Sequence, residues 1–250
     1  MLFSIVTVTF NSEETLKRTI DSLLNQSISN FEYIIIDGKS SDSTVEIIKS
    51  YEQEFDKQNI AFTWASEKDT GIYDAFNKGI KLAKGNWISF LGSDDFYIEN
   101  ALELYAEQIE KQSNELDFIH SVVKVDKKKV IKDKWEWKQF RKGMNIAHVG
   151  AFHNKNYFKK YGLYNTSYKI AGDYELLLRA KQNLKTYWFD NVTAIMADGG
   201  VSNSQVKNVY LETTKAKIES GKLNYIISKL YYFKWMIKYR VKTILNAIIR

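Results

Sequence analysis

The sequence predicts an α/β fold: a mostly parallel, Rossmann-like sheet with helices on both faces, followed by an amphipathic helical tail. Four short runs rich in β-branched and aromatic residues, at 3–10, 31–36, 60–65 and 86–91, have the length and character of buried strands. A segment with helical spacing separates each of these runs from the next. Because strand and helix alternate in this way, the strands are expected to run parallel.

Start and stop signals mark the helices between these strands. Asn11 and the two acids after Ser12 precede apolar residues at 16, 20, 23 and 24, a spacing that predicts the first helix. Ser43 and Glu46 form a predicted capping box, which starts a helix that runs to about residue 54. A third helix is expected over 72–83, and Gly85 suits the position just beyond its end.

The pattern becomes mixed after residue 97. The expected elements are a helix at 98–112, a hairpin over 117–135, a loop with His148, a short helix ending at Gly162, a helix beginning near Gly172 and a strand at 186–196. No linker rich in Pro, Gly or Ser divides the chain, so this part is expected to pack on the first.

The composition excludes several classes of protein. The 250 residues include no cysteine, which excludes a disulfide framework, a zinc–thiolate site and a thiol nucleophile. The net charge is +6, but seven basic residues and no acidic ones lie in 222–250, so the preceding residues are close to neutral. The first ten residues do not resemble a signal peptide, and no apolar run has the ~18 residues of a spanning helix.

Acidic residues follow three of the predicted strands. They are Asp37 after the second strand, Glu67 and Asp69 after the third, and Asp94 and Asp95 after the fourth. In open parallel sheets, ligands bind at the carboxyl ends of the strands. A cluster of carboxylates there is unfavourable unless a cation such as Mg²⁺ joins it, together with substrate phosphates. The alternative is that these are ordinary polar turn residues, but their joint placement at one edge favours a ligand site.

Four segments, taken in order, resemble a known family. They read IVTVTFN, IIIDGKSSDST, EKDTGIYDAFNKGIKLAKGNWISFLGSDD and KIAGDYELLLR. Together they resemble glycosyltransferase family 2, of the type that builds bacterial surface polysaccharides, over about residues 3–200. The resemblance implies an inverting enzyme with the GT-A fold and a nucleotide-sugar donor. It divides the chain into a nucleotide-sugar-binding half at 1–97, an acceptor-binding half at 98–221 and the tail at 222–250.

The resemblance also implies roles for the acids. Asp37 matches the aspartate that contacts the nucleotide base, and Asp69 matches a second nucleotide-contacting acid. Asp94 and Asp95 match a metal motif, usually Asp-x-Asp, whose last aspartate binds Mg²⁺ or Mn²⁺; here Ser93 replaces the first acid. The expected donor-binding residues are Thr9, Asp37, Glu67, Asp69, Asp94 and Arg179.

The resemblance covers four further positions in the second part of the chain. Asp173 matches the general base, and Gly172 stands where the family often has a glutamate. The alternative for Asp173 is a plain helix cap. Arg179 matches an arginine that either faces phosphate or is structural. His148 lies where the resemblance puts a polar substrate contact.

Packing roles are expected for the other histidines and for the tryptophans. His120 and His153 are assigned to loop or core positions, and Trp64 and Trp87 to the core. Trp188 is also expected in the core. Trp135 and Trp137 are expected on a half-exposed strand near the acceptor side, where packing is favoured over sugar binding.

The tail has the pattern of an interfacial helix. Apolar residues form one helical stripe: Leu223, Ile226, Ile227, Leu230, Ile237, Val241, Ile244, Leu245 and Ile248. Lys229, Lys238 and Lys242 lie off that stripe among several aromatic residues. This pattern predicts peripheral contact of 222–250 with the cytoplasmic face of a membrane. The alternative is a terminal helix that packs on the domain or in a dimer.

The predicted function is transfer of a sugar, with inversion, from a nucleotide-diphosphate sugar to a hydroxyl. We favour a UDP-sugar donor, a lipid-linked or growing surface glycan as acceptor, and a divalent metal. An inactive scaffold is an alternative, prompted by Ser93 and Gly172. A nucleotidyltransferase is another, although NSEETLK after the first strand is not its glycine-rich basic loop. A nucleic-acid-binding protein is disfavoured because the body is near neutral.

Overall fold

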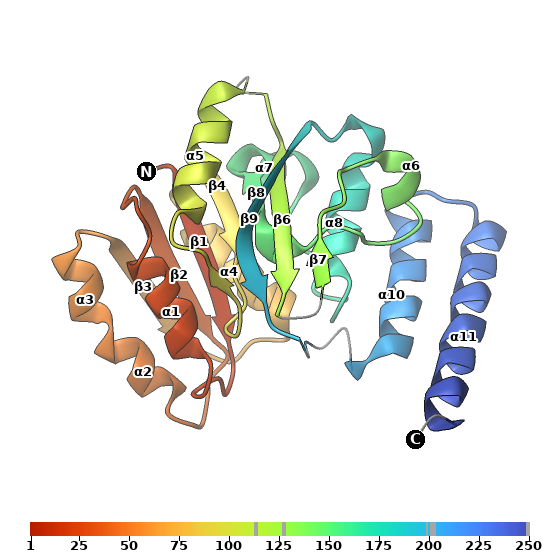
Figure 1. The fold of residues 1–250 in the computed structure, drawn as a ribbon, viewed down its shortest axis with the longest axis horizontal. Helices are drawn as coiled ribbons and strands as arrows, with labels where there is room; N and C mark the ends of the chain where they lie inside the picture. The colour runs from red at the N-terminus through yellow and green to blue at the C-terminus, as the bar shows by residue number, and fades with distance from the viewer. Residues whose placement is uncertain (113–114, 127–128, 199, 201–203, 249–250) are drawn as a thin grey trace.

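The computed structural model describes the chain except residues 113–114, 127–128, 199, 201–203 and 249–250, and describes no side chains at 238 and 242–248. Within the described residues the strands form one nine-stranded sheet, in the order β3-β2-β1-β4-β8-β6-β9-β5 with β7 paired to β6. Helices cover both faces of this sheet, and two helices stand at the end of the molecule opposite α2 and α3 (Figure 1).

The first part of the chain forms the parallel strands. These are β1 (Phe3–Thr9), β2 (Phe31–Asp37), β3 (Ala61–Ser66) and β4 (Trp87–Phe90). The helices between them are α1 (Leu16–Leu24), α2 (Thr44–Ser50), α3 (Glu52–Lys57) and α4 (Ile72–Leu82). Because helices cover both faces, nearly every residue of β1 and β2 is buried, as their unbroken apolar runs predict. The predicted alternation of strand and helix is confirmed.

The helix predicted from 44 to 54 is wrong in two details. It breaks at Tyr51 into α2 and α3, where the backbone amides of Tyr51 and Glu54 bond three residues back instead of four. The Tyr51 hydroxyl donates to Asp21 of α1 at 2.6 Å. The capping box does not form either, since the Ser43 side chain makes no cap hydrogen bond and the Ser43 amide donates to Glu13 at 2.9 Å.

The second part continues the same sheet. Its strands are β5 (Phe96–Tyr97), β6 (Phe118–Val125), β7 (Lys129–Ile131), β8 (Ala151–Asn154) and β9 (Thr186–Met196). Its helices are α5 (Ala101–Lys111), α6 (Trp137–Phe140), η1 (His148–Gly150), α7 (Lys155–Tyr161), α8 (Gly172–Ala180) and η2 (Lys181–Asn183). β8 pairs antiparallel with both β4 and β6, so the two parts share one sheet.

Two of the histidines and Trp87 pack as predicted, but the other tryptophans differ from the prediction. His120, His153 and Trp87 are buried, whereas Trp64 and Trp188 are partly exposed. The expected strand around Trp135 and Trp137 is wrong. Trp137 begins the short helix α6, and the Trp135 ring packs on the Phe140 ring with centroids 4.2 Å apart, an arrangement that a flat strand does not allow.

The chain ends in two packed helices, α10 (Val206–Glu219) and α11 (Tyr225–Ile248) (Figure 1). Helix α10 was not predicted from the sequence. The Tyr210 and Trp235 rings stack across the pair at 5.8 Å, and the Lys217 ammonium lies 5.7 Å from the Tyr231 ring. Burial lowers the pKa of Lys217 to about 8.

One face of α11 is apolar and exposed, and it carries Ile226, Ile227, Leu230, Phe233, Ile237 and Val241. Tyr225 and Trp235 are also exposed but lie toward α10, where Trp235 stacks on Tyr210 and Tyr225 lines a hollow with Leu211. Of the predicted stripe and its flanking lysines, the side chains of Ile244, Leu245, Ile248, Lys238 and Lys242 lie outside the described part of the structure. Among the residues described, no helix is long and apolar enough to cross a bilayer.

Candidate active site

Asp37 lies where β1 and β2 end, and Asp69 lies close to it. Asp37 is the last residue of β2, pairs in register with Thr9 and is fully buried. Its carboxylate accepts hydrogen bonds from the Ser40 amide, at 3.0 Å, and from the hydroxyls of Ser40 and Ser66. These bonds fix the Asp37 carboxylate at the carboxyl edge of the sheet.

Asp69 lies directly over this strand end. A Cβ on Gly38 would fall 2.8 Å from Oδ2 of Asp69, so any larger residue at 38 would displace the Asp69 carboxylate from this position. The other Asp69 oxygen accepts the Gly71 amide at 2.8 Å. Thr9 contributes a buried hydroxyl that has no partner among the described residues. Glu67 is more peripheral, because its carboxylate pairs with Lys78 at 3.0 Å and is 60% exposed.

Asp94 and Asp95 form a second acidic group, after β4. Both carboxylates crowd over Gly92, where a built Cβ would lie 2.7 Å from Asp95 Oδ2 and 3.0 Å from Asp94 Oδ1. Burial, and then the charge of Asp94, raises the pKa of Asp95 to about 7, although the Ala197 amide donates to it at 2.8 Å. A cation between the two carboxylates relieves this repulsion. Among the described residues, no group of three or more His, Cys, Asp or Glu side chains is placed to hold a metal ion.

Asp173 approaches this edge from α8. It is the second residue of that helix, and its Oδ1 accepts the amide of Tyr174 at 2.7 Å. The Tyr73 hydroxyl, from α4, lies 3.5 Å from the same oxygen and donates to the carbonyl of Ile170 at 2.7 Å. A Cβ on Gly172 would fall 2.7 Å from the Tyr73 ring, which explains why this chain has glycine there. The base candidate is thus joined to the segment that carries Asp69.

Sequence reasoning missed Tyr73, although it lies within the segment EKDTGIYDAFNKG that carried the resemblance. Burial, and then the charge of Asp173, raises the pKa of its hydroxyl well above the usual range, so Tyr73 acts as a neutral donor. The signal available was its position two residues after Gly71, in the turn that also holds Asp69.

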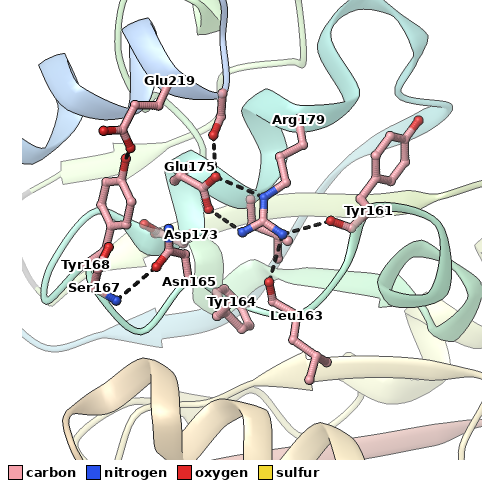
Figure 2. Close-up of polar contacts among 12 residues, drawn as sticks. Tyr161, Leu163, Tyr164, Asn165, Ser167, Tyr168, Asp173, Glu175, Arg179 and Glu219 are labelled. Atoms are coloured by element: carbon pink, nitrogen blue, oxygen red, sulfur yellow. Dashed lines mark hydrogen bonds and ion pairs between the residues drawn. The ribbon is translucent and has the colours of Figure 1, made fainter.

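Arg179 makes structural contacts. Figure 2 shows its guanidinium between the Glu175 carboxylate and the carbonyls of Tyr161 and Leu163. The bonds to the two carbonyls are both 2.8 Å, and the pair with Glu175 is bidentate. With its donors engaged in this way, the structural alternative is favoured over a phosphate contact.

His148 lies among aromatic rings near Asp173. Its Nε2 is 3.0 Å from the Tyr164 hydroxyl, and its ring stacks on Phe90 with centroids 5.2 Å apart. Burial lowers the pKa of His148, and the opposing effect of Asp173 is smaller. His148 is therefore a neutral hydrogen-bonding group rather than a cation, and its predicted substrate contact stays a prediction.

Comparison with known proteins identifies the family. The sequence profile described as Glycosyl transferase family 2 matches residues 4–172, which is more than half of the chain. The chain belongs to this family. A PGL/p-HBAD biosynthesis glycosyltransferase of Mycobacterium bovis is 29% identical over 227 residues, which cover 84% of this chain and 83% of the relative. The prediction of a nucleotide-sugar-dependent glycosyltransferase is confirmed, and the nucleotidyltransferase and nucleic-acid-binding alternatives are set aside.

Solved structures agree on the fold. S. aureus TarS 1-349 in complex with UDP-GlcNAc has a TM-score of 0.71 at 18% identity, covering 94% of this chain and 72% of that one. The mannosyltransferase PcManGT from Pyrobaculum calidifontis, in complex with GDP-Man and Mn²⁺, has a TM-score of 0.69 at 12% identity, covering 92% and 69%. At these identities the likeness concerns the fold, and it confirms the GT-A architecture.

Proposed function

We propose that this glycosyltransferase moves a sugar from a UDP-sugar to an acceptor hydroxyl with inversion, and that Asp173 is its general base. The observation that carries the proposal is the meeting of Asp37, Asp69, Asp94 and Asp95 at one sheet edge, with Asp173 joined to it through Tyr73. In this proposal residues 1–97 hold the donor and 98–221 hold the acceptor.

The proposed reaction is a direct displacement. Asp173 accepts the proton of the acceptor hydroxyl, and the freed electron pair forms the new bond to the anomeric carbon. The bond between that carbon and the diphosphate oxygen breaks at the same time, and its electrons leave with the nucleotide diphosphate. Because the acceptor attacks from the opposite face, the configuration inverts and no enzyme nucleophile is needed. Asp37 and Asp69, with the Thr9 hydroxyl, bind and orient the nucleoside.

The carboxylate pair fits a divalent ion. Asp94 and Asp95 crowd over Gly92, and the raised pKa of Asp95 reflects a repulsion that Mg²⁺ or Mn²⁺ bound to both would remove. Such an ion, when bound, neutralises charge on the departing diphosphate. The Mn²⁺ in PcManGT supports this assignment.

The choice of UDP is supported by TarS, whose structure holds UDP-GlcNAc, although PcManGT holds GDP-Man. Thermal unfolding with UDP, GDP, dTDP and CDP, each with and without Mn²⁺ or Mg²⁺, tests it. A ligand at 100 times its Kd stabilises by about 2.7 kcal/mol, which raises Tm by several degrees. We expect the largest metal-dependent shift with UDP. Asp95→Asn should lose that shift, whereas Asp173→Asn should keep it but lose transfer.

Two outcomes contradict the proposal. A larger shift with another nucleotide overturns the UDP assignment, and near-normal turnover by Asp173→Asn overturns the base assignment. The absence of a shift with any nucleotide would favour the inactive scaffold.

We also propose that the tail binds an anionic membrane surface on the cytoplasmic face, close to a lipid-linked or growing surface glycan. The exposed apolar face of α11 and the basic residues of 222–250 support this, since apolar burial and cationic charge both favour an anionic interface. Relatives named for PGL/p-HBAD biosynthesis and, provisionally, for teichuronic acid biosynthesis support the acceptor class.

Co-sedimentation with vesicles tests the membrane contact. The full chain should bind vesicles that contain phosphatidylglycerol and should not bind vesicles of phosphatidylcholine alone. Leu230→Glu and Phe233→Glu should abolish binding, because both side chains are largely exposed on α11. Val130→Glu is the matched control, since Val130 is also exposed but lies on β7. Equal binding by all variants would contradict the proposal.

A further inference from the structure

We propose that Glu212 of α10 is a positioning residue for the general base, and that it acts by holding the backbone segment 169–171 just before Asp173. The inference rests on the proposed function, because it assumes that Asp173 is the base. Glu212 lies beyond the residues that the family profile matches, 4–172, so the resemblance does not assign it a role.

Three consecutive amides converge on the Glu212 carboxylate. Oε1 accepts the amide of Lys169 at 2.9 Å, and Oε2 accepts the amides of Ile170 and Ala171 at 2.8 and 2.9 Å. Hydrogen bonds to a charged acceptor are about twice as strong as neutral ones. Because Ala171 is the cap residue of α8, the carboxylate fixes the point from which that helix, and Asp173 at its second position, begins.

The same segment is held from its other side by the donor half. The Tyr73 hydroxyl donates to the carbonyl of Ile170 at 2.7 Å, and the Lys169 ammonium donates to the carbonyl of Thr70. The peptide groups of Ile170 are therefore bonded to α4 in one direction and to α10 in the other. The position of Asp173 is set by both contacts, one from the segment that carries Asp69 and one from α10.

Only a carboxylate suits this position. Glutamine has one acceptor oxygen, and its amide nitrogen would face a backbone N–H, so Glu212→Gln loses acceptors without changing the size of the side chain. The change lies away from the acids at the ends of β2 and β4. It should therefore move Asp173 without altering donor binding.

The test compares Glu212→Gln with a control on the same helix. Glu219→Gln also removes a charge from α10, but Glu219 bonds the Tyr168 hydroxyl rather than the backbone of 169–171. Two quantities are measured in the full chain: the rate of UDP release from UDP-GlcNAc with water as acceptor, and hydrogen exchange of the amides at 169–171. Tyr73→Phe, which removes the bond on the other side, serves as a second variant if Glu212→Gln folds poorly.

For Glu212→Gln we expect kcat to fall about ten- to hundred-fold, because a misplacement of about 1 Å costs a rate factor of this size. KM for UDP-GlcNAc and the metal-dependent Kd for UDP should stay within about two-fold, and exchange at 169–171 should become at least ten-fold faster. Tyr73→Phe should likewise lower kcat while KM for UDP-GlcNAc stays nearly unchanged. Glu219→Gln should show none of these changes.

The outcomes distinguish failure of the Glu212 positioning role from failure of the proposed transferase function. If the wild type releases UDP and Asp173→Asn does not, the base assignment holds; unchanged kcat in Glu212→Gln then overturns the positioning role. A rise in KM with unchanged kcat, or equal losses in Glu219→Gln, overturns it as well. If the wild type releases no UDP, the proposed function fails and the positioning role fails with it, whatever the exchange rates show.

Discussion

Replacing Asp95 with asparagine should stabilise the metal-free protein, and the gain should depend on pH. Burial and Asp94 raise the pKa of Asp95 from 3.8 to about 7, so the fold favours the protonated carboxyl. Between pH 3.8 and pH 7, the Asp95 carboxyl is ionised in the unfolded chain and protonated in the folded chain. The free energy of unfolding then falls by about 1.36 kcal/mol for each unit that the pH rises. From pH 5 to pH 7 the wild type therefore loses about 2.7 kcal/mol through this group, and no more above pH 7.

Asparagine keeps the acceptor for the Ala197 amide but cannot ionise. In EDTA, the Tm of Asp95→Asn relative to the wild type should rise by about 5–10 °C between pH 5 and pH 8.5. Asp190→Asn, at an exposed position, is the control and should show a much smaller change. With Mn²⁺ and UDP at pH 8.5, the wild type should have a higher Tm than Asp95→Asn, because the variant cannot bind the ion. A Tm difference between Asp95→Asn and wild type that does not change with pH would refute the argument.

Three further substitutions are predicted from contacts. Gly172→Ala should destabilise by about 1–3 kcal/mol in urea unfolding, because its Cβ would overlap an aromatic ring, whereas Gly143→Ala, with no atom within 4 Å, should be nearly neutral. Arg179→Lys should cost about 1–3 kcal/mol of stability through loss of the bidentate pair with Glu175 but leave the Kd for UDP unchanged; a weakened Kd would instead indicate a donor contact. His148→Gln should lower UDP release at neutral and alkaline pH, because burial lowers the pKa of His148 and favours the neutral imidazole; a loss confined to low pH would contradict this.

The fold of residues 1–97 was predictable from the sequence because its signals are local. Strands β1 and β2 are continuous apolar runs, Asp37 ends β2, and Asp94 and Asp95 follow β4 within a few residues. Since β2 and β4 both pair in parallel with β1, these acids come to one edge of the sheet. The break at Tyr51 was not predictable, because the apolar spacing continues across it and no glycine or proline marks it.

The rest of the chain depends on contacts between distant segments. Helix α10 escaped prediction because its buried residues are Thr214, Ala216 and Lys217, which do not form an apolar stripe. The role of Arg179 was ambiguous in the sequence because it depends on carbonyls at 161 and 163, which no pattern marks. The sequence thus predicted that Asp37, Asp94 and Asp95 come to one edge of the sheet, but not which residues contact the backbone just before Asp173.

The contact of Glu212 with residues 169–171 limits how this enzyme can be recombined with others. A hybrid that joins its first 204 residues to the C-terminal helices of another protein would keep every carboxylate proposed for chemistry. Unless the new helices present an acid at the place of Glu212, three amides at the start of α8 would lose their acceptor. An exchange of α10 and α11 would therefore need to carry the segment 169–173 with them.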